Sequence, residues 1–234
     1  MLKFLGFGDL ANINLGNTSC YYKSKDELLL IDVGVLNFER LVKSDICSKV
    51  KTVYIFITHN HPDHIGGLAS TIFYLEYWQK IKGIKIIIPK NSNQKNNIRE
   101  FLRLQGVSDR EYSFISESTF KMDKIKKLQT SKIKHSTLES FAVTLYYENC
   151  KDVYVGDNND IDFVKQSIAT LGKNDRLYTD VTSIKIPVHL YFDELLKITP
   201  MHKRKNVVCC HFDSEKTIEK AEKLGFSTAI NFIW

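Results

Sequence analysis

The chain has 234 residues, of which 43% are hydrophobic and 26% charged, with a formal net charge of +6. This composition excludes a disordered chain, and the length predicts a single domain over residues 1–234. The sequence lacks a secretory leader pattern, and no apolar run approaches the ~18 residues that a membrane span needs. We therefore expect a soluble, cytoplasmic protein with no membrane partner.

The five cysteines are odd in number and contain no C-x-x-C pair. They are Cys20, Cys47, Cys150, Cys209 and Cys210. This pattern argues against a disulfide framework and against a thiolate zinc site. We expect the thiols to be reduced and mostly buried.

The positive net charge has two interpretations. Most lysines are scattered, as on a plain solvated surface, but residues 121–134 and 203–205 form local basic clusters that could attract an anionic substrate, nucleic acid included. His202, beside the second cluster, is expected to be a solvated residue, with a substrate contact as the alternative. The sequence leaves the oligomeric state open between a monomer and a homodimer.

Strand and helix signals alternate along the chain. The first half predicts strands over residues 2–7, 17–22, 27–31, 50–57 and 84–89, and helices over 38–44, 65–81 and 97–104. The second half predicts strands over 141–147, 153–155, 177–182, 207–210 and 226–234, and helices over 161–171, 193–198 and 214–224. Only residues 112–128 give a weak pattern. Such alternation is what an α/β layered fold requires.

The segment from Thr58 to Gly67 concentrates metal-ligand side chains directly after a predicted strand. Its donors are His59, His61, Asp63 and His64. Imidazole and carboxylate suit zinc, iron or manganese when no thiolate is present. His59 and His61 point the same way on an extended segment, and Pro62 stiffens the turn that follows, so one loop could supply two neighbouring cations. The alternative is a polar loop whose histidines only cap the next helix.

The pattern H-x-H-x-D-H followed by Ile65-Gly66-Gly67 resembles the signature of the metallo-β-lactamase-fold hydrolases. The resemblance extends over nearly the whole chain, because later motifs match in the same order. It implies an α/β fold of a particular kind, a four-layer αββα sandwich of mixed sheets with helices on the outer faces. The flavodiiron oxygen reductases of this superfamily carry Glu where this chain has His61, which argues against an electron-transfer role.

The resemblance also implies the remaining members of the metal site. The implied ligands are His59, His61 and His135 on one cation and Asp63, His64 and His211 on the other, with Asp157 shared between them. Asp32 would support the metal loop, although a simple strand-ending turn explains it equally well. The implied cofactors are two divalent metal ions, zinc first, with manganese or iron as alternatives. A hydroxide bridging the two ions would be the nucleophile.

Asp180 and His189 resemble a pair found in the phosphodiesterase branch, which includes ribonuclease Z: an acidic residue after a strand, followed by a histidine that begins a short helix. The resemblance implies a phosphodiesterase or nuclease acting on a small-molecule, nucleotide or nucleic-acid phosphodiester. His189 would be the general acid for an alkoxide leaving group, so Asp63, His189 and Asp180 are the candidate catalytic residues. The long arm with which ribonuclease Z holds tRNA has no counterpart between His135 and Asp157.

Three alternatives to that function stay open. The same metal site could act on a thioester, a lactone or another acyl compound. The chain could also be a non-catalytic binding member of the fold, although such members usually lack one or more ligands. His189, finally, could be an incidental loop residue.

Overall fold

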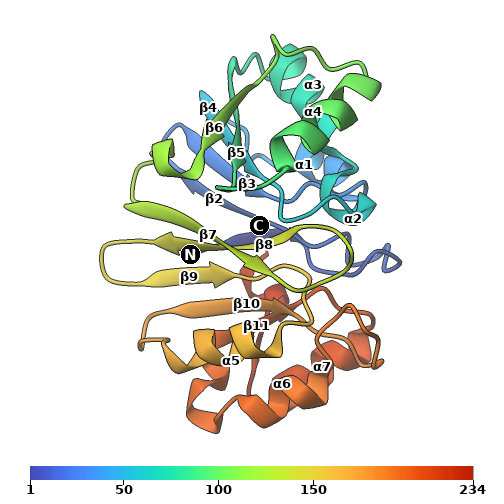
Figure 1. The fold of residues 1–234 in the computed structure, drawn as a ribbon, viewed down its shortest axis with the longest axis vertical. Helices are drawn as coiled ribbons and strands as arrows, with labels where there is room; N and C mark the ends of the chain where they lie inside the picture. The colour runs from blue at the N-terminus through green and yellow to red at the C-terminus, as the bar shows by residue number, and fades with distance from the viewer. Residues whose placement is uncertain (234) are drawn as a thin grey trace.

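Residues 1–233 are described by a computed structural model with two six-stranded sheets packed between layers of helices. Figure 1 shows helices α1, α3 and α4 at one end of the molecule and α5, α6 and α7 at the other, with both sheets between them. The predicted four-layer αββα sandwich is confirmed.

The two sheets are formed by consecutive halves of the chain. The first contains β1 (Lys3–Gly6), β2 (Ser19–Ser24), β3 (Glu27–Ile31), β4 (Thr52–Phe56), β5 (Gly83–Ile88) and β6 (Ser113–Ser116). The second contains β7 (Lys127–Ile133), β8 (Ser140–Tyr146), β9 (Lys151–Tyr154), β10 (Arg176–Asp180), β11 (Val207–Cys210) and β12 (Ser227–Thr228). In each sheet the strands lie in sequence order.

Helices connect the strands in both halves. The first half contains α1 (Asn37–Lys43), α2 (Pro62–Ile65), α3 (Leu68–Phe73), a π-helical turn η1 (Tyr74–Trp78), α4 (Gln94–Leu104) and a 3₁₀ turn η2 (Glu117–Thr119). The second contains α5 (Ile161–Ala169), α6 (Phe192–Ile198), the 3₁₀ turn η3 (Met201–Asn206), α7 (Glu215–Lys223) and the 3₁₀ turn η4 (Ala229–Phe232).

The two halves repeat one pattern of strand pairing. Strands β1, β2 and β3 are antiparallel neighbours, and β3 to β6 are parallel. In the second sheet β7, β8 and β9 are antiparallel and β9 to β12 are parallel. Parallel strands place their carboxyl ends at one edge of a sheet, which is where ligand sites of α/β proteins form.

The central strands of the first sheet are apolar on both faces. Along β3, Leu28 and Leu30 pack in the cluster under the first-half helices, whereas Leu29 and Ile31 pack in the cluster between the sheets. Because successive side chains point to opposite faces of a strand, such a strand must be covered on both sides. The continuous apolar runs in the sequence therefore require the four layers.

Two predicted elements were wrong in extent. The terminal strand predicted over residues 226–234 is only the two-residue β12, followed by η4; Trp234 lies outside the described residues. β12 pairs with β11 only through Ser227 and Thr228, so Ala229 and Phe232 reach the core from a 3₁₀ turn, whereas Ile230 and Ile233 are exposed. Apolar content alone does not distinguish these two backbones.

The helix predicted over residues 65–81 is interrupted at Gly66 and Gly67. The Gly67 N–H donates to Val33 O at 2.8 Å, and a Cβ on Gly67 would lie 2.5 Å from Gly34 O. This close approach of two backbones separates α2 from α3. The chain then continues into the π-helical turn η1.

The structure agrees with the expectations for the thiols and for His202. All five cysteines are free, and four of them are buried, as predicted. His202 is exposed on η3. Within residues 1–233, no helix combines the length and apolar character that crossing a bilayer requires.

Candidate metal centre

The metal loop follows β4 and leads directly into α2. Residues 57–61 carry the chain from the sheet edge, and Pro62 begins α2, where it needs no hydrogen-bonded N–H. His59 and His64 are fully buried and Asp63 is 4% exposed. A contiguous stretch of six residues therefore delivers two donors to each of two neighbouring groups, as the spacing predicts.

Asp32 holds this loop in place. Its Oδ1 accepts a hydrogen bond from Thr58 N at 2.7 Å, and its Oδ2 lies 2.9 Å from both Thr58 Oγ1 and His64 Nδ1. Asp32 is fully buried and has φ of 60°, a conformation that costs a non-glycine residue of order 1–3 kcal/mol. Its contacts are those of a residue that orients a ligand, which agrees with the supporting role and not with a simple strand-ending turn.

Replacing Asp32 by alanine is expected to destabilise the loop strongly. The change leaves Thr58 N–H, the Thr58 hydroxyl and His64 Nδ1 without their acceptor, each at a cost of about 1–3 kcal/mol. We also expect a 10–100-fold loss of metal affinity, as for other residues that orient ligands. Thermal unfolding and metal titration measure both effects. Asp26→Ala, which removes an exposed partner of Lys51, is the matched control and should change neither.

Donors from four parts of the chain, the metal loop, His135, Asp157 and His211, converge on two groups that share Asp157. The first contains His59, His61, His135 and Asp157, and the second contains Asp63, His64, Asp157 and His211. Within each group one donor atom per residue lies within 4.8 Å of all the others. The structure thus brings together every residue predicted as a metal ligand, and Asp157 belongs to both groups, as expected of a shared carboxylate.

Within each group, donor atoms of different residues lie close together. His61 Nδ1 is 2.9 Å from His59 Nε2 and 3.2 Å from His135 Nε2. In the second group, Asp157 Oδ2 is 3.1 Å from His64 Nε2 and 3.2 Å from His211 Nε2. Nitrogen and carboxylate lone pairs therefore face a common space in each group.

Two buried atoms of this cluster have no hydrogen-bond partner of acceptable geometry, His64 Nε2 and Asp157 Oδ1. Unpartnered buried polar atoms are costly and rare in native proteins. A divalent cation coordinated by imidazole and carboxylate would satisfy both, and the donor types are those of zinc, iron or manganese sites. The residues present therefore fit a pair of divalent ions.

The protonation of the histidines in the first group agrees with this fit. Burial lowers the pKa of His59 and of His61, and it lowers the pKa of His135 to about 4, so all three imidazoles are neutral as ligands must be. Burial acts in the same direction on His211, but the charges of Asp157 and Asp63 outweigh it and raise the pKa of His211 to about 9. The second group thus attracts positive charge strongly, which a divalent ion would supply.

His135 is oriented by the loop that carries His189. Its Nδ1 lies 2.6 Å from Val188 O, and because a carbonyl can only accept, Nδ1 must carry the proton. This leaves Nε2 free to ligate. The loop before α6 therefore contributes to the metal site through its backbone as well as through His189.

His189 and Asp180 form the predicted pair. His189 Nδ1 is 2.9 Å from Asp180 Oδ2 and 3.9 Å from Asp157 Oδ2. Burial acts to lower the pKa of His189, but the hydrogen bond and charge of Asp180 outweigh it and raise the pKa above its usual value. Asp180, a buried carboxylate, therefore favours the protonated form of this imidazole beside the metal donors.

A cavity of about 280 Å³ opens beside these residues. Its wall includes His61, Asp63, Asp157, His189 and His211. Leu10, Ala11 and Ile186 complete one side of it, and these apolar wall residues were missed by sequence reasoning. Leu10 is 57% exposed. In the sequence, the one signal that pointed to this wall was an apolar residue within a polar loop.

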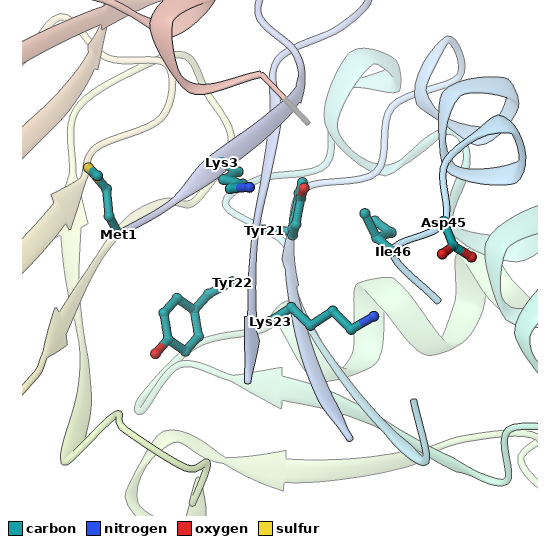
Figure 2. Close-up of a pocket in the computed structure, with 7 residues that line it drawn as sticks. All are labelled: Met1, Lys3, Tyr21, Tyr22, Lys23, Asp45 and Ile46. Carbon is teal, nitrogen blue, oxygen red and sulfur yellow. The ribbon is translucent and has the colours of Figure 1, made fainter. Parts of the chain in front are cut away.

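A second cavity, of about 430 Å³, lies against β1 and β2 (Figure 2). It is lined by Met1, Lys3, Tyr21, Tyr22, Lys23, Asp45 and Ile46. These residues include amines and phenols but no imidazole. None of the residues predicted as metal ligands lines this cavity.

Comparison with known proteins identifies the family. The model of the family described as "Anti-Pycsar protein Apyc1" matches residues 1–232. The chain belongs to the Anti-Pycsar protein Apyc1 family. A curated relative, ribonuclease Z of Thermococcus onnurineus (strain NA1), is 34% identical over 88 residues, 37% of this chain. The match spans only 28% of that relative's length, so this Apyc1-family chain corresponds to part of it.

Solved structures share the fold of this Apyc1-family chain. The metallo-β-lactamase fold protein YhfI of Bacillus subtilis superposes with a TM-score of 0.66 and 15% identity, covering 97% of this chain and 94% of YhfI. A diphosphatase from the PhnP family superposes with a TM-score of 0.71 and 18% identity, covering 97% and 93%. These similarities confirm the predicted metallo-β-lactamase fold.

Proposed function

We propose that this protein is a dinuclear metal-dependent phosphodiesterase. The observation that carries the proposal is the contact between buried Asp180 and partly buried His189, whose imidazole lies beside the shared carboxylate Asp157. A hydrolase of thioesters has little need for such an acid, because a thiolate leaves without protonation. An alkoxide leaving group does need it.

The seven donors described above would hold the two cations, with zinc as the expected metal. When bound, such ions lower the pKa of a water molecule enough to make it a nucleophile at neutral pH and neutralise charge on the phosphoryl oxygens. The chain offers donors of the right type for both cation positions, and the donor Asp157 is common to the two.

His189 would then act on the leaving group. With Nδ1–H held by Asp180, Nε2 is the ring nitrogen available to a substrate in the cavity. It would donate its proton to the departing oxygen as the P–O bond breaks, so that the product leaves as an alcohol. Asp180 would keep the ring in place and stabilise its positive charge.

The relatives favour a phosphoryl substrate, and the short connection between two donors favours a compact one. By their names, ribonuclease Z acts on RNA and the PhnP-family diphosphatase on a diphosphate. Only the hairpin of β8 and β9 separates His135 from Asp157, which supports the absence of a long substrate-binding arm. We therefore favour a small or single-stranded phosphodiester over a folded RNA.

Assays of the zinc- or manganese-loaded protein on bis-p-nitrophenyl phosphate and on a chromogenic thioester test the proposal. We expect hydrolysis of the phosphodiester and little or none of the thioester. Activity on the thioester alone would replace the phosphodiesterase by an acyl hydrolase on the same metal site. Activity on neither compound by fully metal-loaded protein would favour a non-catalytic binding role.

A further inference from the structure

We infer that Asn158 is a positioning residue for His189 and acts on it through Asp180. The inference rests on the proposed function, because it concerns the residue that would protonate the leaving group. Asn158 directly follows the shared carboxylate Asp157 and is fully buried. The sequence around Asn158 does not indicate a contact with Asp180.

Asn158 binds both oxygens of Asp180. Its side-chain Nδ2 donates to Asp180 Oδ1 at 2.6 Å, and its backbone N–H donates to Asp180 Oδ2 at 3.3 Å. The same Nδ2 lies within 3.3 Å of Gly156 O and 3.2 Å of Thr179 Oγ1. Nδ2 can only donate and faces three acceptors, so the amide keeps this orientation although its Oδ1 has no partner. The side-chain and backbone contacts together hold the plane of the Asp180 carboxylate.

Fixing this plane determines which oxygen meets His189. Oδ1 is occupied by the Asn158 amide, so Oδ2 is the oxygen that accepts Nδ1–H of His189 at 2.9 Å. Without Asn158 the buried carboxylate could rotate, and the imidazole could turn away from the cavity. The proton that leaves Nε2 passes to the alkoxide oxygen, while the other proton stays on Nδ1, hydrogen-bonded to Asp180, and His189 becomes neutral.

The backbone of the His189 loop has separate attachments. Val188 O accepts from His135, and Pro187 O accepts from the Asn159 amide in a short hydrogen bond. These contacts hold the loop near the metal donors without touching Asp180. Loss of the Asn158 side chain is therefore expected to disturb the orientation of His189 and to leave the loop in place.

Leaving-group dependence separates this role from a structural one. For Asn158→Ala, we expect kcat on a dinucleoside monophosphate, which releases an alkoxide, to fall about 10–100-fold with unchanged metal content. With bis-p-nitrophenyl phosphate, whose p-nitrophenolate leaves without an acid, kcat should change less than about threefold. In a His189→Ala background, Asn158→Ala should cause no further loss, because both changes remove the same step.

Equal losses of activity on both substrates in Asn158→Ala, or losses that add to those of His189→Ala, would overturn the inference.

If Asn158→Ala fails to fold or to retain its metal, a pair of variants that exchanges the amide and the carboxylate tests the inference instead. Asn158→Asp places two carboxylates in contact and should abolish alkoxide-releasing activity, whereas Asn158→Asp with Asp180→Asn restores one amide and one carboxylate and should recover part of it. No recovery would contradict the inference. A wild-type protein inactive on both substrates would instead contradict the proposed function.

Discussion

Replacing Asp157 by alanine is expected to empty at least one cation position and to lower turnover at least about a thousandfold, the upper range for loss of a single electrostatic contact in an active site. Asp157 is the residue that both donor groups share, and its Oδ2 lies within 3.2 Å of the Nε2 atoms of His64 and His211. Without it, neither group keeps its full donor set. No other single substitution affects both positions directly.

Metal analysis after gel filtration, together with assay on bis-p-nitrophenyl phosphate, measures the effect of Asp157→Ala. Asp162→Ala is a suitable control, because Asp162 is an exposed residue in the first turn of the nearby helix α5. The control should keep wild-type metal content and rate. Full occupancy of both positions in Asp157→Ala would show that the carboxylate is not shared.

For His189→Ala we expect unchanged metal content and a turnover lower by roughly 10²–10⁴-fold, the range typical of a lost general acid. His189 is held by Asp180 at 2.9 Å and forms a separate group with Asp157 and Asp180, outside the two groups that collect the predicted ligands. Its loss should therefore affect the chemical step and not cation binding. The effect should be largest for substrates with an alkoxide leaving group.

Steady-state kinetics on the two phosphodiester substrates, with metal content measured on the same samples, tests His189→Ala. His202→Ala replaces an exposed histidine on η3 and serves as the matched control. A His189→Ala protein as fast as wild type on the dinucleoside monophosphate would show that His189 is a bystander. Loss of metal would instead make His189 a ligand.

Much of the metal centre was predictable because its densest part is contiguous. His59, His61, Asp63 and His64 follow one strand, and their types and spacing limit their chemistry. The more distant His135, Asp157 and His211 could be selected only through a family resemblance, because nothing local distinguishes them from structural residues. His211 has φ of 57°, and like Asp32 it directly follows a strand, but such backbone strain is not visible in a sequence.

The rest of the site depends on tertiary contacts. Three features of the site join segments that are distant in the sequence. They are the hydrogen bonds from Asn158 to Asp180, the contact of the Val188 carbonyl with His135, and the apolar wall at Leu10. The repetition of strand pairing in the two halves was equally invisible. Strand pairing constrains which positions are apolar and not which residues fill them, so the two halves keep no obvious sequence similarity.

The central claim is that this chain holds two divalent cations. A crystal of the zinc-loaded protein, measured on both sides of the zinc absorption edge, tests it most directly through the anomalous difference map. The account predicts two peaks per chain, one among His59, His61, His135 and Asp157, and one among Asp63, His64, Asp157 and His211. A single peak, or peaks elsewhere with these side chains uncoordinated, would contradict it.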